Sequence, residues 1–334
     1  PPTEKQTGRR PTQAPCAETF GSQTEPLPVA APLAPASAPP DKPAMSGMLL
    51  SLGHGYTADA LTLRLGSGWQ VVGTTRASER AEALRAAGVE PRTWPEADLA
   101  ADIAAATHIL SSAGPTDAGD PILAAVADTL AEARPSWVGY LSATSVYGDH
   151  AGGWVDEDTP LAPTTEMGAR RAAAEAEWQA ASRRGGWPLA IFRLAGIYGP
   201  GRGPLARVRG GTAKRIVKPG HMFSRIHVDD IANVLAASMA RPESAAPGGT
   251  IYNVCDDEPA PADEVLAHAA ELLGAPPPPQ VAFEDAAMSP MARAFYADNK
   301  RVRNDRIKDA LGVRLLYPTY REGLAAQLEA ERAG

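Results

Sequence analysis

The sequence predicts an α/β protein that is built on a doubly wound parallel sheet and carries a smaller C-terminal α/β lobe. Three observations support this prediction. Short apolar runs alternate with stretches of helical periodicity from residue 48 onward, as in repeated βαβ units. A glycine-rich turn joins the first apolar run to the first helical stretch. Of the 334 residues 44% are hydrophobic, which is enough for one large domain and a smaller lobe.

The first turn carries a pattern that is typical of dinucleotide binding. Met48–Leu52 is a short apolar strand, and residues 53–58 read G-H-G-Y-T-A before the helix begins. Gly53 permits a tight turn, Gly55 lets a diphosphate approach the backbone, and Ala58 keeps the helix close to the sheet. Free N–H groups at the helix start favour the anion. The pattern predicts a Rossmann-type cofactor site rather than a purely structural turn. The cofactor-binding residues predicted in this turn are Gly53, His54, Gly55, Tyr56 and Ala58.

The end of the second strand, Trp69–Thr75, indicates which cofactor is used. An NAD site places Asp or Glu there to bind the ribose 2′-hydroxyl, but this chain has Thr75 followed by Arg76. A guanidinium can pair with a 2′-phosphate, so NADP is favoured and NAD is the alternative. The structural alternative is that Arg76 is a solvated surface residue that contacts no cofactor. Ser112, near the end of the fourth strand, is a further predicted cofactor contact.

The rest of the sheet follows from the same alternation of strands and helices. Right-handed crossovers between parallel strands are expected throughout. The predicted helices are 77–87, 99–106 and 122–133, and the predicted strands are 89–94, 108–113 and 137–142.

Composition and charge exclude several classes of function. A formal net charge of -7 argues against general binding to nucleic acid or to anionic membranes, and no apolar run is long enough to span a bilayer. Cys16 and Cys255 have no metal-ligand spacing, so no metal is expected and a reducing, cytoplasmic location fits.

The chain divides into three parts on composition and pattern. Residues 1–46 are expected to be a disordered extension, because Pro, Ala, Thr and Ser dominate and the apolar residues show no period. Residues 47–195 are expected to form the NAD(P)-binding domain, which also receives about 225–256. Residues 196–224 and 257–330 are expected to form the smaller substrate lobe.

Four later motifs resemble those of one enzyme family. They are Leu141–Asp149 (LSATSVYGD), Phe192–Pro200 (FRLAGIYGP), Ile226–Ala232 (IHVDDIA) and Ile251–Val254 (IYNV). In this order they resemble the extended short-chain dehydrogenases/reductases, the NAD-dependent epimerase/dehydratase family. The finer resemblance is to its atypical YeeZ-like branch. It is carried by residues 147–157 and by 299–318, where NKRV, LGV and YP occur.

The resemblance implies a catalytic site that this chain has altered. Catalytic members use a Tyr-x-x-x-Lys pair after the fifth strand and a preceding Ser or Thr, in which lysine lowers the pKa of the tyrosine for acid–base work. Here Met167, Arg171 and Ala143 occupy the three positions. A thioether cannot transfer a proton, so the usual hydride chemistry needs other residues.

Substitutes are predicted around the same strand end. Tyr147 lies where ligands bind in such folds and is the candidate acid or base, although the tyrosine of this motif is also structural or substrate-facing in the family. Thr144 supplies a candidate hydroxyl. Arg171 is a candidate for contact with a ribose hydroxyl or phosphate, and so counts as both catalytic and cofactor-binding. His150 is a weaker candidate, since a loop histidine is often only solvated. Asp229 or Asp230 is expected to cap a helix that begins near residue 231.

The remaining segments are assigned to the substrate lobe. Six Arg and Lys residues between 201 and 218 suit an anionic or nucleotide-sugar substrate, as the family implies, or form a solvated loop. Helices are expected at 262–273, 286–295 and 304–311. The helices at 122–133 and 165–183 form the usual dimer surface of the family, so a homodimer is one expectation.

Three functions remain open at this point. The first is an NADP-dependent oxidoreductase or an epimerase/dehydratase-like enzyme with an altered Ser/Tyr/Lys site. The second is a non-catalytic NADP-binding sensor or scaffold, which the altered positions favour. The third is an interaction protein with an empty Rossmann site.

Overall fold

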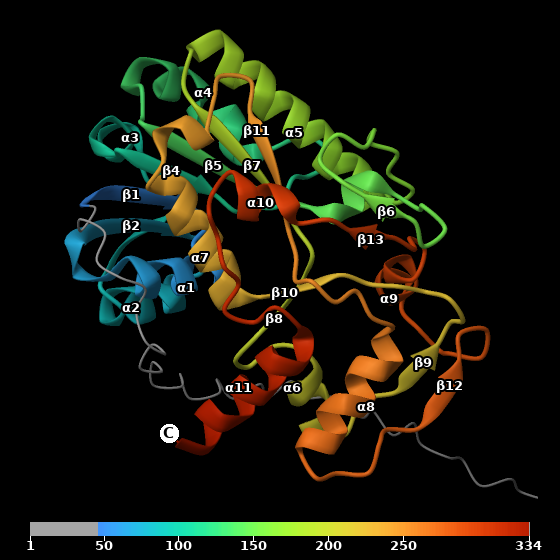
Figure 1. Ribbon diagram of the computed structural model, residues 1–334. Coiled ribbons are helices and arrows are strands. Elements are labelled where there is room, and N and C mark those ends of the chain that lie inside the picture. The colour runs from blue at the N-terminus through green and yellow to red at the C-terminus, as the bar shows by residue number, and fades with distance from the viewer. Residues whose placement is uncertain (1–45, 334) are drawn as a thin grey trace, which may run out of the picture. The chain divides into compact units, whose positions relative to one another are not determined.

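A seven-stranded parallel sheet forms the centre of the protein, in the order β11-β7-β5-β4-β1-β2-β3 (Figure 1). The computed structural model describes residues 46–333, so the predicted extension over residues 1–46 lies almost wholly outside the described residues. The strand order reverses at β1, which pairs with β2 on one side and β4 on the other. The doubly wound sheet is thereby confirmed. The strands are β1 Gly47–Leu52, β2 Trp69–Thr75, β3 Val89–Thr93, β4 His108–Ser111, β5 Trp137–Ala143, β7 Leu189–Leu194 and β11 Thr250–Val254.

Helices cover both faces of the sheet, because successive side chains of a strand point to opposite faces. Leu49 of β1 packs in a core that also holds Leu61 and Ile231, whereas Leu50 packs in a second core with Trp178. The first core contains residues of α1 Tyr56–Leu65, α2 Ser78–Ala86 and α7 Val228–Met239. The second contains residues of α3 Ala100–Ala105, α4 Pro121–Ala133 and α5 Glu166–Gly185.

The smaller lobe has its own hydrophobic core. Tyr198, Leu205, Val265 and Leu324 are buried together there. The core brings together α6 Pro204–Arg209, α8 Ala262–Leu272 and α11 Tyr320–Ala333. Short parallel pairs accompany it: β8 Gly196–Tyr198 with β10 Arg225–His227, and β9 Arg215–Val217 with β12 Gln280–Ala282.

The loop after β5 is joined to the C-terminal part of the chain by a third short parallel pair. β6 Trp154–Val155 pairs with β13 Arg301–Val302 (Figure 1). The remaining elements are the 3-10 turns η1 Gly66–Gly68, η2 Thr144–Tyr147 and η3 Pro242–Ser244, and the helices α9 Pro290–Phe295 and α10 Asp305–Asp309.

Several predicted boundaries differ from the structure. The helix expected over 286–295 begins only at Pro290, and α11 was not predicted at all. Val302, Ile307 and Leu311 were expected in the smaller lobe, but they pack in the core of the large sheet. None of the helices within residues 46–333 combines the length and the apolar character that a bilayer span requires.

Candidate functional site

The glycine turn adopts the geometry that its pattern predicts. Gly53 has a φ of +84°, and a Cβ added there would lie 3.0 Å from the backbone nitrogen of Ala113. The Gly53 N–H donates to Thr74 Oγ1 at 2.7 Å. Gly55 precedes α1 and no side chain caps this helix start. A Cβ added at Gly55 would meet only Gly53 O, at 3.8 Å. Open space and uncapped N–H groups therefore coincide at this turn, which fits a diphosphate.

His54 shapes this turn from inside the fold. Its ring is buried against Gly73, where an added Cβ would come within 2.8 Å of His54 Nδ1. Its N–H donates to Thr74 O, and Nε2 lies 3.2 Å from Asp59 Oδ1. The side chain and the N–H of His54 therefore stabilise the turn, and its predicted cofactor contact stays a prediction.

Asp59 is the acidic residue in the first turn of α1, and its charge is compensated. Arg80 Nη2 donates to Asp59 Oδ2 at 2.6 Å. Burial raises the pKa of Asp59, but the hydrogen bonds from His54 and Arg80 outweigh it, and the pKa lies below its usual value. This pairing limits the repulsion that Asp59 would exert on a bound anion.

Three predicted cofactor residues lie at the carboxyl ends of β2 and β4. Thr75 is buried, and its Oγ1 accepts from the N–H of Ala77 at 3.2 Å. Arg76 follows β2, is exposed, and pairs with no acidic side chain of the described residues. Ser112 donates its N–H to Leu52 O at 2.9 Å and its hydroxyl to Gly53 O. Because β2 and β4 both pair in parallel with β1, these residues lie at the same edge of the sheet as the glycine turn that follows β1.

Tyr147 ends η2 directly after β5, and its hydroxyl is enclosed by other protein groups. Its side chain is 0% exposed, and its hydroxyl donates to Asn253 Oδ1 at 2.7 Å while accepting from Arg193 Nη1 at 2.8 Å. Burial raises the pKa of Tyr147 to about 12, against the opposing effect of Arg193. A hydroxyl so enclosed has no room for a substrate. The Tyr147 hydroxyl thus has two protein partners, and the acid–base role of Tyr147 stays a prediction.

The tyrosine belongs to a buried ionic network that was not predicted from the sequence. Arg193 and Glu175 are 3% and 2% exposed, and their side chains meet at 2.8 Å between Nη2 and Oε2. Glu175 also accepts from the hydroxyl of Ser142 on β5. The sequence signal was the arginine inside the FRLAGIYGP motif, since a charge in an otherwise apolar strand needs a buried partner.

Arg171 and Thr144 lie near the ends of β4 and β5, as predicted. Arg171 Nη1 donates to Leu141 O at 3.0 Å and to the Tyr140 hydroxyl at 3.2 Å. Thr144 begins η2 and is half-buried. Met167, in the first turn of α5, is 59% exposed. The structure thus brings Arg171 and Thr144 to the same edge as the glycine turn, together with an exposed thioether in place of a phenol.

The HVDD motif caps a helix in a different way from the prediction. His227, not an aspartate, is the N-cap of α7, and its Nδ1 accepts from the Asp229 N–H at 3.2 Å. Asp230 instead binds the chain near its C-terminus, accepting from Leu316 N–H at 2.6 Å and Tyr317 N–H at 3.0 Å. Burial raises the pKa of Asp230 to about 6 and lowers that of His227 to about 4.

The six basic residues between 201 and 218 do not form one cluster. Arg209 pairs with Glu331, Arg215 Nε donates to Pro278 O at 2.9 Å, and Lys218 Nζ donates to Tyr296 O at 2.5 Å. Arg202 instead lies over the ring of Tyr56, with its guanidinium carbon 5.6 Å from the ring centroid. A common anion site for the whole segment is therefore not formed.

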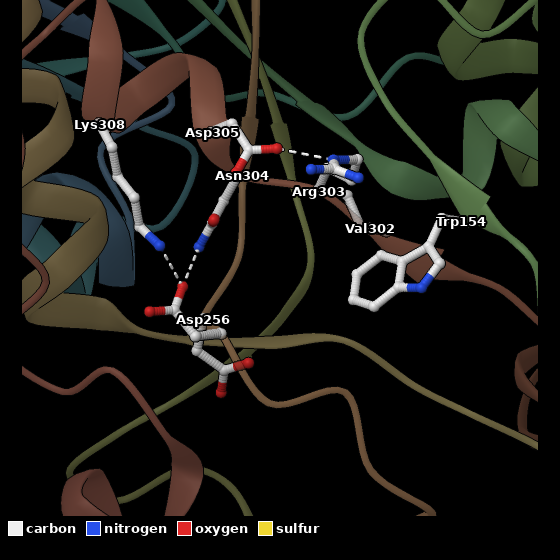
Figure 2. A pocket seen from close by; sticks show the side chains of 8 residues that line it. Trp154, Asp256, Val302, Arg303, Asn304, Asp305 and Lys308 are labelled. Atoms are coloured by element: carbon white, nitrogen blue, oxygen red, sulfur yellow. Dashed lines mark hydrogen bonds and ion pairs between the residues drawn. The ribbon is translucent and has the colours of Figure 1, made fainter.

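A cavity of about 380 Å³ lies beyond the end of β11 and includes none of the predicted site residues (Figure 2). Several of its polar side chains pair with one another: Lys308 and Asn304 both donate to Asp257 Oδ1 at 2.6 Å, and Arg303 pairs with Asp305. Within residues 46–333 no group of three or more His, Cys, Asp and Glu residues could hold a metal ion. The cavity is lined by Trp154, Asp256, Asp257, Val302, Arg303, Asn304, Asp305 and Lys308.

Comparison with known proteins identifies the family. Residues 52–255, which contain the glycine turn and all four motifs, match the model of the NAD dependent epimerase/dehydratase family. This chain belongs to the NAD-dependent epimerase/dehydratase family. Protein YeeZ of Escherichia coli K12 is 30% identical to it over 283 residues, which are 80% of this chain and 95% of YeeZ. The resemblance to the YeeZ-like branch is thereby confirmed.

Two further proteins are similar to this chain. A 3-diazoavenalumate denitrifying reductase from Streptomyces is 37% identical over 192 residues, but the match spans only 59% of that reductase and 52% of this chain. A solved structure of a functionally unknown conserved protein from Silicibacter pomeroyi is 55% identical, with a TM-score of 0.80, and the match covers 85% of this chain and 99% of that one.

Proposed function

We propose that this family member binds NADP and acts as an oxidoreductase or epimerase/dehydratase-like enzyme on a carbonyl or sugar-nucleotide substrate. The observation that carries the proposal is the turn at Gly55, where open space meets an uncapped helix start beside the exposed guanidinium of Arg76. A doubly charged diphosphate and a 2′-phosphate complement these groups.

Each part of the cofactor has a candidate partner in the chain. The turn from Gly53 to Tyr56 would hold the diphosphate, Arg76 the 2′-phosphate, and Arg171 the end near β4 and β5. Hydride transfer is the chemistry that the bound cofactor supplies. Thr144 is then the candidate for a hydroxyl that binds the substrate oxygen, because Tyr147 is buried and Met167 has no proton to transfer. A homodimer through α4 and α5 stays a prediction.

Tyr147 and Met167 also favour a second function. With Tyr147 enclosed and a thioether at position 167, a protein that binds NADP without turnover is the alternative. Such a protein would act as a redox sensor or scaffold.

Cofactor choice is tested by titrating NADPH and NADH against wild type and Arg76→Asp, following tryptophan fluorescence. The variant should lose about 10- to 100-fold in NADPH affinity, because a charge-assisted contact becomes a repulsion, and NADH affinity should change little. Arg85→Asp, at an exposed arginine of α2, is the matched control. Unchanged discrimination in Arg76→Asp removes Arg76 from the site.

Turnover distinguishes the two functions. Wild type is incubated with NADPH and a panel of carbonyl compounds and nucleotide-sugars, and absorbance at the reduced-nicotinamide band is followed. Loss of absorbance supports the enzyme, and Thr144→Ala should then lower kcat. Tight NADPH binding without turnover across the panel supports the sensor.

A further inference from the structure

A glycine-rich hairpin after β8 lies against the first turn of α1. In it Gly199 and Arg202 exchange backbone hydrogen bonds, with Gly199 N to Arg202 O at 3.0 Å and Arg202 N to Gly199 O at 2.9 Å. Gly201, inside this hairpin, has a φ of +70°, which favours glycine. Residues 199–202 therefore form a tight turn that presents the Arg202 side chain at its end.

The hairpin is fastened to the glycine turn by Tyr56, the first residue of α1. The Tyr56 hydroxyl donates to Pro200 O at 3.1 Å. A Cβ added at Gly199 would come within 2.6 Å of that hydroxyl, so the contact requires glycine. Two segments about 145 residues apart in the chain are thus held together at the place where a diphosphate would meet the helix start.

The hydrogen bond between Tyr56 and Pro200 places Arg202, one of the basic residues between 201 and 218, beside the glycine turn. Its guanidinium carbon lies 5.6 Å from the Tyr56 ring centroid, and the side chain is exposed and forms no ion pair within the described residues. The nearest acid on the first turn of α1, Asp59, already pairs with Arg80 at 2.6 Å. Among residues 46–333, no acidic side chain forms an ion pair with Arg202, which lies next to the proposed anion site.

We propose that Arg202 binds the diphosphate of the cofactor from the side opposite the helix start, with the Tyr56–Pro200 contact setting its position. The proposal rests on the proposed cofactor site and adds a residue from the smaller lobe to it. The diphosphate would then be held between N–H groups of the first domain and a guanidinium of residues 199–203. Bound nucleotide would in this way join the two parts of the protein.

The test measures dissociation constants of NADPH, ADP and 2′-AMP for wild type and Arg202→Gln, by calorimetry. ADP carries the diphosphate, whereas 2′-AMP carries the adenosine and the 2′-phosphate without it. Arg202→Gln should weaken NADPH and ADP by about 10-fold each and leave 2′-AMP unchanged. The salt dependence of ADP binding should also become less steep. Lys214→Gln, at an exposed lysine of the same basic segment, is the matched control. Tyr56→Phe keeps the ring but removes the hydroxyl, and should give a smaller loss for ADP.

The outcomes separate this inference from the proposed function. Equal ADP affinity in wild type and Arg202→Gln overturns the role of Arg202 while leaving the cofactor site intact. An equal loss for 2′-AMP also overturns it, because the change would then disturb the site as a whole. If wild type binds neither NADPH nor ADP, the proposed function and this inference both fail.

Discussion

At the residue scale, the pair of Glu175 and Arg193 shows how a buried charge is tolerated. Both side chains are almost fully buried, and the guanidinium meets the carboxylate through Nε and Nη2. Arg193 also donates to Tyr147, and Glu175 accepts from Ser142. Each partner therefore depends on the other, since an unpaired charge in this place would lose its hydration without compensation.

Removal of one charge should destabilise the protein strongly. Glu175→Gln leaves the Arg193 guanidinium buried without its counter-ion, which costs about 3–5 kcal/mol in the free energy of unfolding. Urea denaturation followed by tryptophan fluorescence measures the change. Asp305→Asn, in the exposed pair with Arg303, is the control and should leave the transition where it is. If Glu175→Gln and Asp305→Asn lowered the free energy of unfolding equally, burial would not explain the importance of the Glu175–Arg193 pair.

Single residues were predictable where the backbone decides their role. Gly53 and Gly55 followed from the spacing of the turn, because the required φ and the open space are backbone properties. The environment of Tyr147 was not predictable, since its hydroxyl partners are Arg193 and Asn253, 46 and 106 residues further along the chain. The direction of a hydroxyl depends on such distant contacts.

At the element scale, the start of α7 depends on the neutral ring of His227. Its Nδ1 accepts a hydrogen bond as the N-cap, and the ring is 2% exposed, packed against Tyr198 and Tyr317. Burial holds the pKa of His227 at about 4, below the usual 6.5. The folded protein therefore keeps this ring neutral at a pH where the unfolded chain protonates it.

Stability should fall with acid because of this histidine. Between pH 6.5 and 4 the unfolded chain binds a proton that the folded protein does not, so the free energy of unfolding decreases as pH falls. His227→Asn retains a good N-cap but lacks the titrating ring. Between pH 7 and pH 4.5 the free energy of unfolding of wild type should fall by about 2–3 kcal/mol more than that of His227→Asn. Urea denaturation at the two pH values measures both changes. Asp230 acts with the opposite sign but is present in both proteins. A constant difference would contradict the role of His227.

Elements were predictable in the sheet and less so in the smaller lobe. The strands of the sheet were predictable because they are short apolar runs, and the helices that cover them because their apolar residues recur with a period near 3.6 residues. The two- and three-residue strands β6, β8 and β13 are too short to show any period, and form because backbone partners from distant segments reach them. The helix α11 was not predicted, although Tyr320, Leu324 and Leu328 are spaced four residues apart and are buried in the core of the smaller lobe.

At the scale of the whole molecule, the described residues form one compact unit that contains both the sheet and the smaller lobe. Residues 302–313 of the C-terminal part pack in the core of the sheet, and Asp230 holds the backbone at Leu316. The lobe is thus attached to the sheet through several segments. We expect the two parts to unfold together.

Leu324→Ala tests this cooperativity. Leu324 is 0% exposed in the core of the lobe, so the truncation should cost about 2–5 kcal/mol. All six tryptophans precede residue 188, outside the lobe, and report on the sheet. Tryptophan fluorescence and far-UV circular dichroism should therefore shift to lower urea by the same amount, and Glu329→Ala on the same helix should shift neither. An earlier transition in circular dichroism alone would indicate a lobe that unfolds separately.

The position of β11 has a consequence for the integrity of the chain. This strand, residues 250–254, completes the sheet beside β7, although an exposed turn at Gly210 and Gly211 separates the two in sequence. A protease that cuts at that turn would produce two fragments, of which the first lacks an edge strand and the second has a strand without a sheet. Each fragment would expose apolar surface that only the other can cover, so a nicked protein should remain associated and migrate as one species until denatured.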